Sequence, residues 1–198
     1  MTQASNLTRE EWLNKGAEML TPLIIEAGGG AFKPPLCSVG FPQGSRGGKN
    51  GARAIGQCWS KTCSEDKKRS HIFLHPELAD PVRVLDVLAH ELVHASVGVE
   101  HGHKKPFRDV AVALGLEGKM TATVAGEKLT ERLNTIIKAI GEYPHVKLNA
   151  DTAKKKGSRL LKAECPACGC IARITRKWAE QGLRCGCNED NPEWMEIT

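Results

Sequence analysis

The sequence predicts an α+β protein in which helices pack on a small, mostly antiparallel sheet and a small cysteine-bearing module follows. Three observations support this class. Apolar residues recur at helical spacing over residues 8–27, short strand-like segments separated by turns come next, and closely spaced cysteines gather after residue 160. We expect one domain over residues 1–150 and a second region over 151–198, made of a basic linker and the cysteine module.

The individual elements follow from periodicity and from residues that start or stop helices. Thr8 and Glu11 form a capping box for the first helix. Asp80 and Pro81 begin a strongly apolar helix that Gly98 ends. Helices are expected over residues 8–27, 81–97, 106–114 and 127–140. Strands are expected over residues 36–41, 54–60 and 71–74, with a glycine-rich basic loop over 43–53.

Composition excludes several classes of protein. The chain has 198 residues, 40% of them hydrophobic, and a formal net charge of +5. No apolar stretch approaches the roughly 18 residues that cross a membrane, and the first residues do not form a secretory signal. We therefore expect a cytoplasmic protein, whose eight cysteines are metal ligands or buried thiols rather than disulfides.

The apolar helix contains the sequence His90-Glu91-Leu92-Val93-His94. Two histidines four residues apart lie on one face of a helix, so both imidazoles can reach one ion. The glutamate between them can take a proton from a water molecule on that ion. Three ionisable groups in an apolar helix need a partner, so the pattern predicts a metal site with Glu91 as general base.

A catalytic zinc ion needs a third protein ligand, and the segment after this helix offers Glu100, His101 and His103. Glutamate in a glycine-rich turn is usually just solvated. On the residues alone, His101 and His103 both stay open as the third ligand.

The motif, the short loop and the pair His103 and Phe107 resemble the SprT/Spartan family of zinc metalloproteases. The resemblance covers about three quarters of the chain, because members have a small sheet before the zinc helix and many end in a zinc ribbon. It implies zincin-like helices, a catalytic zinc ion and cleavage of DNA-associated proteins. In that family a histidine follows the loop and an aromatic residue lies four positions later, where it anchors the next helix. His103 and Phe107 match this spacing, so the resemblance favours His103 as the third ligand. Members also usually carry a His-Gly dipeptide, which occurs here as His101-Gly102, so His101 stays the alternative.

The C-terminal cysteines predict a second, structural zinc ion. Cys165 and Cys168 form a knuckle of two thiolates around a tight turn, and Cys185 and Cys187 supply the second pair, with Cys170 in reserve. A module this small does not fold on apolar burial alone. Three other cysteines, which lack knuckle spacing, are expected to be core or turn thiols: Cys37, Cys58 and Cys63.

The C-terminal region is locally basic, and Trp178 lies beside Arg176 and Lys177. Trp178 is either exposed and available for base stacking or part of the small core of the module. Residues 151–184 hold nine lysines and arginines against three acidic residues. Phosphate contacts and base stacking would let this region bind DNA, preferably single-stranded. The predicted nucleic-acid contacts are Lys154, Lys155, Lys156, Arg159, Arg173, Arg176, Lys177 and Trp178.

Together these features predict a zinc-dependent metalloendopeptidase that acts on a protein substrate, with the ribbon and basic loops recruiting DNA. The sequence does not identify a residue that would help zinc to stabilise the oxyanion of the reaction. Tyr143 is a candidate, although a role in core packing fits it better. Two alternatives remain. One is a nucleic-acid-binding zinc protein with a vestigial site, against which the intact Glu91 argues, and the other is a zinc hydrolase acting on a non-peptide substrate.

Overall fold

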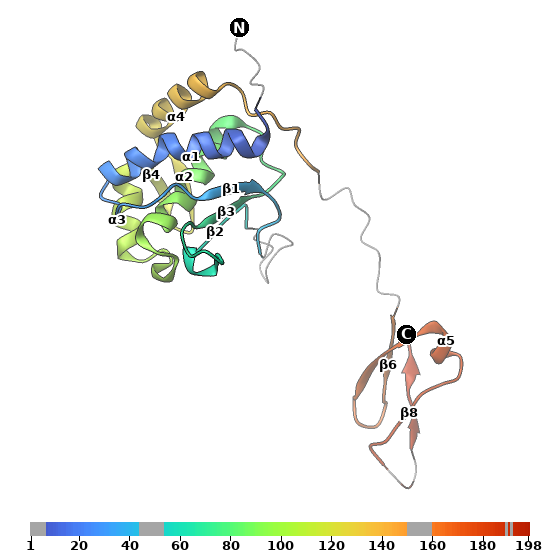
Figure 1. Ribbon diagram of the computed structural model, residues 1–198. Helices are drawn as coiled ribbons and strands as arrows, with labels where there is room; N and C mark the ends of the chain where they lie inside the picture. Colours follow the sequence, from blue (N-terminus) through green and yellow to red (C-terminus); the bar gives the residue numbers. More distant parts are fainter. Residues whose placement is uncertain (1–6, 44–53, 150–159, 189, 191) are drawn as a thin grey trace. The chain divides into compact units, whose positions relative to one another are not determined.

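The computed structural model describes residues 7–43, 54–149, 160–188, 190 and 192–198 (Figure 1). The chain divides into two compact units, residues 1–150 and 151–198, and each is considered by itself. Helices and small sheets occur together in the first unit, which confirms the α+β class. Among the described residues, no helix is both long and apolar enough to cross a membrane.

The sheet of the first unit has three strands in the order β1-β3-β2 (Figure 1). These are β1 (Leu36–Val39), β2 (Gly56–Trp59) and β3 (His71–Leu74). Strand β2 runs antiparallel to β3, whereas β1 runs parallel to it. The sheet that was expected to be mostly antiparallel is therefore mixed, while every other pairing in the described residues is antiparallel. Because β1 and β2 run in opposite directions and β3 lies between them, β3 has one parallel and one antiparallel neighbour.

One face of this sheet packs on helices α1 (Arg9–Glu26) and α2 (Pro81–Val97). Alternate strand residues Cys37, Ile72 and Leu74 point into this core and are buried, as the period of a strand requires. The predicted capping box of α1 is present: Thr8 accepts from the Glu11 backbone, and the Glu11 carboxylate accepts from the Thr8 backbone. The sheet and α1 thereby fix the position of α2.

Helix α2 is buried along most of its length, as its composition predicts. The Asp80 carboxylate accepts a hydrogen bond from the Arg83 backbone at 2.7 Å, Pro81 occupies the first turn, and Gly98 ends the helix with φ of 98°. That positive φ suits a residue without a Cβ. The chain then turns through a short 3₁₀ helix, η2 (Val99–His101), into helix α3 (Lys105–Leu114).

A two-stranded hairpin follows α3, which sequence reasoning did not predict. Its strands are β4 (Leu116–Lys119) and β5 (Ala122–Ala125), and β5 packs on α2. Each strand has only four residues, Leu-Glu-Gly-Lys in β4 and Ala-Thr-Val-Ala in β5, which is too short for a strong alternating pattern. Helix α4 (Glu127–Ile140) then packs on α2 and α1 with the predicted bounds.

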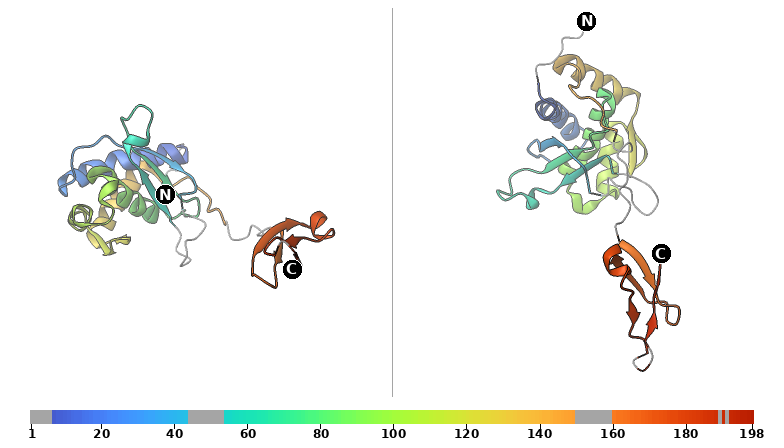
Figure 2. Two further views of the ribbon diagram at one scale, coloured as in Figure 1. Left: turned by 90° about the horizontal axis from the view of Figure 1, so that it is seen from below. Right: turned by 90° about the vertical axis from the view of Figure 1, so that its right-hand side faces the viewer.

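The second unit consists of short strands with one short helix (Figure 2). Strands β6 (Leu160–Glu164), β7 (Ile171–Thr175) and β10 (Glu196–Ile197) form one sheet in the order β10-β6-β7. Strands β8 (Arg184–Cys185) and β9 (Glu193–Trp194) form another, and α5 (Arg176–Ala179) follows β7. Its small core contains Ala163, Cys165, Cys185 and Met195.

Candidate metal centres and catalytic cleft

Three histidines of the first unit converge on one point. His90 and His94 lie one turn apart on α2, and His103 lies between η2 and α3. The Nε2 atom of His103 lies 3.1 Å from that of His90 and 3.2 Å from that of His94. Three ring nitrogens, one from each histidine, can therefore face a single ion.

The loop and α3 together bring His103 to this point. Phe107 is fully buried, and its ring centroid lies 4.8 Å from that of His90, 4.3 Å from that of His94 and 4.9 Å from that of His103. The aromatic ring thus packs against all three imidazoles. His101 instead is half-exposed, lies outside the cluster, and has Glu100 as its neighbour, with 4.0 Å between Nε2 and Oε1. The structure thereby selects His103 rather than His101.

The donor set fits zinc. A zinc ion about 2.0–2.1 Å from each of several tetrahedrally arranged nitrogens requires them to lie about 3.4 Å apart. The two closest nitrogen pairs approach that separation. Burial lowers the pKa of His90 to about 4 and that of His94 to about 3, and lowers the pKa of His103 as well. The imidazoles are therefore neutral at neutral pH, which is the form that binds a metal.

Glu91 lies beside this triad and is buried. Burial raises the pKa of its carboxyl to about 8, while a hydrogen bond from the Cys58 backbone N–H acts in the opposite direction. A cation held by the histidines would favour the carboxylate form. Strand β2 passes very close: a Cβ built on Gly56 would lie 2.5 Å from Oε1 of Glu91. Only glycine lets the strand approach the carboxyl this closely.

The triad and Glu91 open into a cleft with a volume of about 480 Å³. Part of its lining comes from β2 and the residues before it, and another part comes from the β4–β5 hairpin. Its lining residues are Ala54, Ile55, Gly56, Gln57, Cys58, Arg83, Val87, His90, Glu91, His94, Val99, Gly102, His103, Thr121, Ala122 and Thr123. The candidate metal centre is therefore open to an outside molecule.

The hairpin supplies a residue that sequence reasoning missed. Thr123 is buried, and its hydroxyl lies 2.8 Å from Nδ1 of His90. When Nε2 of His90 faces a metal, Nδ1 carries the proton and donates to Thr123, which fixes the orientation of the ring. The carbonyl of Thr123 accepts from Nη1 of Arg83 at 3.4 Å, and the same Nη1 pairs with Asp86. No local motif marks Thr123, because its role depends on the hairpin folding back over α2.

Replacement of Thr123 by valine is expected to lower zinc affinity about 10–100-fold, because Nδ1 of His90 loses its acceptor while the shape of the side chain stays similar. Competition for zinc with a chromogenic chelator measures this. Thr123→Ser keeps the hydroxyl and should restore most of the affinity. The matched control is Thr121→Val, which changes an exposed threonine of the same cleft. Equal losses in Thr123→Val and Thr121→Val would contradict the orienting role.

The remaining candidates of the first unit are not part of the triad. Tyr143 does not line the cleft; it is buried against Trp12, with ring centroids 4.8 Å apart, and burial raises the pKa of its hydroxyl to about 12. Cys37 is a core thiol and Cys63 an exposed one. Cys58 lines the cleft, and burial strongly raises the pKa of its thiol. None of these three thiols belongs to a metal-binding cluster of the described residues.

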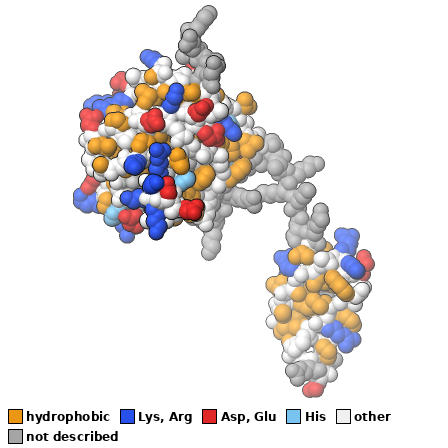
Figure 3. Space-filling view, viewed as in Figure 1, with side chains coloured by type: hydrophobic (Ala, Val, Ile, Leu, Met, Phe, Trp, Pro, Cys, Tyr) orange, Lys and Arg blue, Asp and Glu red, His pale blue; other side chains and the backbone are white. Residues whose placement is uncertain are grey.

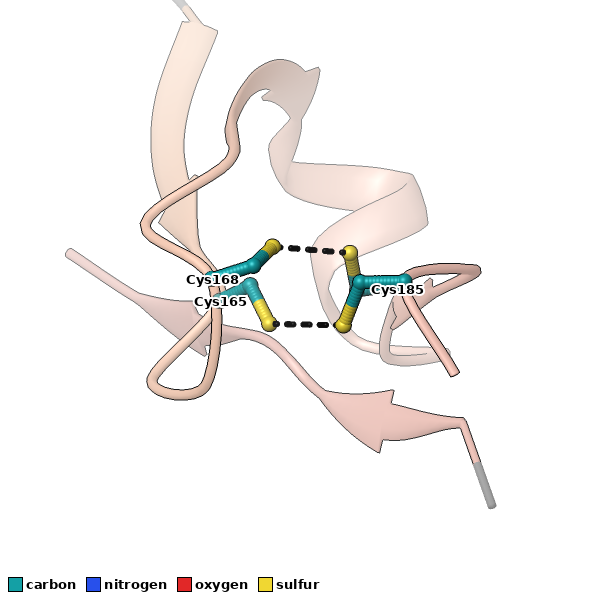
Figure 4. A group of neighbouring side chains, drawn as sticks. Cys165, Cys168 and Cys185 are labelled. Atoms are coloured by element: carbon teal, nitrogen blue, oxygen red, sulfur yellow. Dashed lines mark hydrogen bonds between the residues drawn. The ribbon is translucent and has the colours of Figure 1, made fainter. Parts of the chain in front are cut away.

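Four cysteines of the second unit form a second candidate metal centre (Figure 4). The Sγ atoms of Cys165 and Cys187 lie 3.8 Å apart, and those of Cys168 and Cys185 lie 3.6 Å apart. Zinc–sulfur bonds of about 2.3 Å in a tetrahedron require sulfurs about 3.8 Å apart, so the site fits zinc. Cys170 lies outside the cluster. The prediction of two candidate metal sites is confirmed.

The turn that contains Cys165 and Cys168 also stabilises the thiolate form of Cys165. Backbone N–H groups of Cys168 and Ala167 point at the Cys165 thiol, and the Cys168 N–H is the main reason that its pKa falls to about 7. Hydrogen bonds among the neighbouring sulfurs raise the pKa of Cys187 to about 12. The cluster therefore accepts a first negative charge readily, and full deprotonation needs a bound cation.

The described nucleic-acid candidates are all exposed: Arg173, Arg176, Lys177 and Trp178. Lys154, Lys155, Lys156 and Arg159 lie outside the described residues, as does most of the loop over 43–53. The structure adds Trp194, an exposed aromatic with the guanidinium of Arg184 4.3 Å from its ring centroid. Hydrophobic side chains gather between lysines and arginines on the visible face of this unit (Figure 3).

Comparisons with protein-family models, with curated proteins and with solved structures found no match to this chain. The function therefore has to be argued from the two sites and from the residues around them.

Proposed function

We propose that this protein is a zinc-dependent metalloendopeptidase of the SprT/Spartan type. The observation that carries the proposal is the position of Glu91, a buried carboxyl beside three convergent imidazoles in an open cleft. A zinc ion at the histidines would supply a Lewis acid for water activation and carbonyl polarisation. The sequence resemblance described above points to the same class.

The residues of the cleft have separate roles in peptide hydrolysis. Glu91 accepts one proton from a water molecule whose oxygen attacks the peptide carbonyl carbon. Glu91 then donates that proton to the amide nitrogen and the carbon–nitrogen bond breaks, which gives a carboxylic acid and an amine. The second proton of the water stays on the acid and then passes to the amine, so the final products are a carboxylate and an ammonium group. Thr123 holds the ring of His90 in place, and the glycine at position 56 keeps the strand from displacing the carboxyl.

The shape of the cleft suits a polypeptide. Strand β2 lies at an edge of its sheet and lines the cleft with three consecutive residues, Gly56, Gln57 and Cys58. An extended peptide can add to a sheet edge through backbone hydrogen bonds, which places its carbonyl groups along the cleft. This observation favours a peptidase over a zinc hydrolase for small non-peptide substrates.

Incubation of an unfolded protein such as casein with the zinc-loaded chain tests this proposal. Mass spectrometry of the products should find internal cuts. Trimming of chain ends only, or hydrolysis of esters with no peptide cleavage, would favour another class of hydrolase. Arms with and without single-stranded DNA show whether DNA stimulates cleavage.

We further propose that the second unit recruits DNA, preferably single-stranded. Exposed basic residues and two exposed tryptophans, Trp178 and Trp194, support this, because phosphates pair with cations and bases stack on aromatic rings. The substrates would then be proteins associated with DNA.

Removal of residues 151–198 is expected to weaken DNA binding more than the cleavage of a short peptide. DNA affinity of the full chain should also fall steeply between 50 and 200 mM salt, by an amount on the order of 10³-fold if about six phosphates are contacted. Fluorescence anisotropy with a labelled oligonucleotide measures both. Unchanged affinity after truncation, or affinity that does not respond to salt, would remove the second unit as the DNA-binding element.

A further inference from the structure

The metal cleft continues past His94 into a second hollow. This hollow has a volume of about 720 Å³, and His94 and Val99 line both hollows, so the two adjoin at the candidate metal centre. An endopeptidase holds its substrate on both sides of the bond that it cuts. The two hollows therefore offer one binding region for each side of that bond.

The second hollow is basic. Lys33, Lys61 and Lys68 line it from three different segments of the chain, and all three are exposed. Glu100 is the acidic side chain among its described lining residues, and it already has His101 as a neighbour at 4.0 Å. The three ammonium groups therefore leave a net positive charge along this hollow.

The first hollow carries a fixed cation, Arg83. Nη1 of Arg83 pairs with the buried carboxylate of Asp86 and donates to the Thr123 carbonyl. Within the described residues, Nη1 makes all of the hydrogen bonds of this guanidinium. The remaining guanidinium nitrogens can serve a molecule in the cleft, which Arg83 lines beside His90. A guanidinium held in place this way matches a carboxylate, which it can bind through two parallel hydrogen bonds.

We propose that the cleft selects polypeptide segments with acidic side chains around the cleaved bond. Arg83 binds an aspartate or glutamate on one side, and the three lysines bind acidic residues on the other. The inference rests on the proposed peptidase function and names its substrate class. A protein bound to DNA turns its basic surface toward the phosphates, so acidic segments are those that it leaves accessible.

Four unstructured peptides with the same central sequence test this proposal. Their flanks are neutral, acidic on the N-terminal side, acidic on the C-terminal side, or basic on both sides. The zinc-loaded full chain is expected to show a kcat/KM at least about tenfold higher for each acidic peptide than for the basic one, because charge-assisted hydrogen bonds form only with the former.

Two sets of variants assign the sides. Arg83→Gln should remove the preference for acidic residues on one flank of the peptide, and Arg83→Lys should keep part of it. The triple change Lys33→Gln, Lys61→Gln and Lys68→Gln should remove the preference for acidic residues on the other flank. Arg108→Gln is the control, since Arg108 is an exposed arginine of α3 that lines neither hollow. The lysine variants and Arg83→Lys keep the test valid if loss of the partner of Asp86 unfolds Arg83→Gln.

Equal kcat/KM for acidic and basic peptides would overturn the substrate preference, as would a preference that survives both sets of variants. An oligonucleotide that inhibits cleavage competitively, with inhibition relieved in the lysine variants, would show that the second hollow binds phosphate. That result would also overturn the substrate preference. Failure of the proposed function itself looks different, because the neutral peptide would then stay uncut as well.

Discussion

Replacement of Glu91 by glutamine is expected to abolish peptide hydrolysis while zinc stays bound and the fold stays intact. Glutamine keeps the side-chain volume, and its carbonyl oxygen can still accept from the Cys58 backbone N–H that contacts Glu91. It cannot accept a proton from water, and general-base catalysis contributes about 10²–10⁴-fold. The rate of peptide cleavage and the zinc content of the same sample measure the two effects.

His90→Ala provides the contrast to Glu91→Gln. Two remaining histidines hold zinc poorly, so this variant should lose metal and activity together. Full proteolysis in Glu91→Gln would show that the general-base role is wrong. Loss of zinc from Glu91→Gln as complete as from His90→Ala would make Glu91 a ligand or a structural support, and a vestigial site would then be the better interpretation.

Replacement of Cys165 and Cys168 by serine is expected to unfold the second unit and to reduce the zinc content from two ions to one. Metal binding supplies much of the folding free energy of such modules, with apparent values of about 10–16 kcal/mol for structural zinc. The core here is small: Ala163, Cys165, Cys185 and Met195 are its buried members. Heteronuclear NMR spectra of residues 160–198 and metal analysis report the two effects.

Cys170→Ser is the matched control, because Cys170 is exposed beside the knuckle and lies outside the cluster. It should keep two zinc ions per chain. A second unit that stays folded and zinc-loaded after loss of Cys165 and Cys168 would show that other residues hold the metal.

The sequence was sufficient for the elements whose signals are local. Asp80, Pro81 and Gly98 mark the ends of α2 because caps and helix-stopping residues act on their own turn. His90 and His94 share a face because helical spacing alone places them there. His103 was favoured through the family resemblance, whose spacing from histidine to aromatic His103 and Phe107 match. In the structure the ring of Phe107 packs against the imidazoles of His94 and His103.

The parts that the sequence did not reveal depend on long-range contacts. The β4–β5 hairpin has strands of only four residues, and Thr123 contacts His90 only because that hairpin folds over α2. Arg83 looks like an ordinary residue of a first helical turn until Asp86 and the Thr123 carbonyl fix it in the cleft. The need for glycine at position 56 likewise comes from the carboxyl of Glu91, which lies directly against it and which no local pattern records.

Reconstitution of hydrolysis by zinc tests the central claim most directly. The protein is stripped with a chelator, titrated with zinc, and assayed for cleavage of an unfolded protein at each step, with and without single-stranded DNA. Because zinc-thiolate sites and the histidine site both take up metal, cleavage should be absent in the stripped protein and complete at two zinc ions per chain. Full zinc loading at both sites without any peptide cleavage, in either the presence or the absence of DNA, would contradict it.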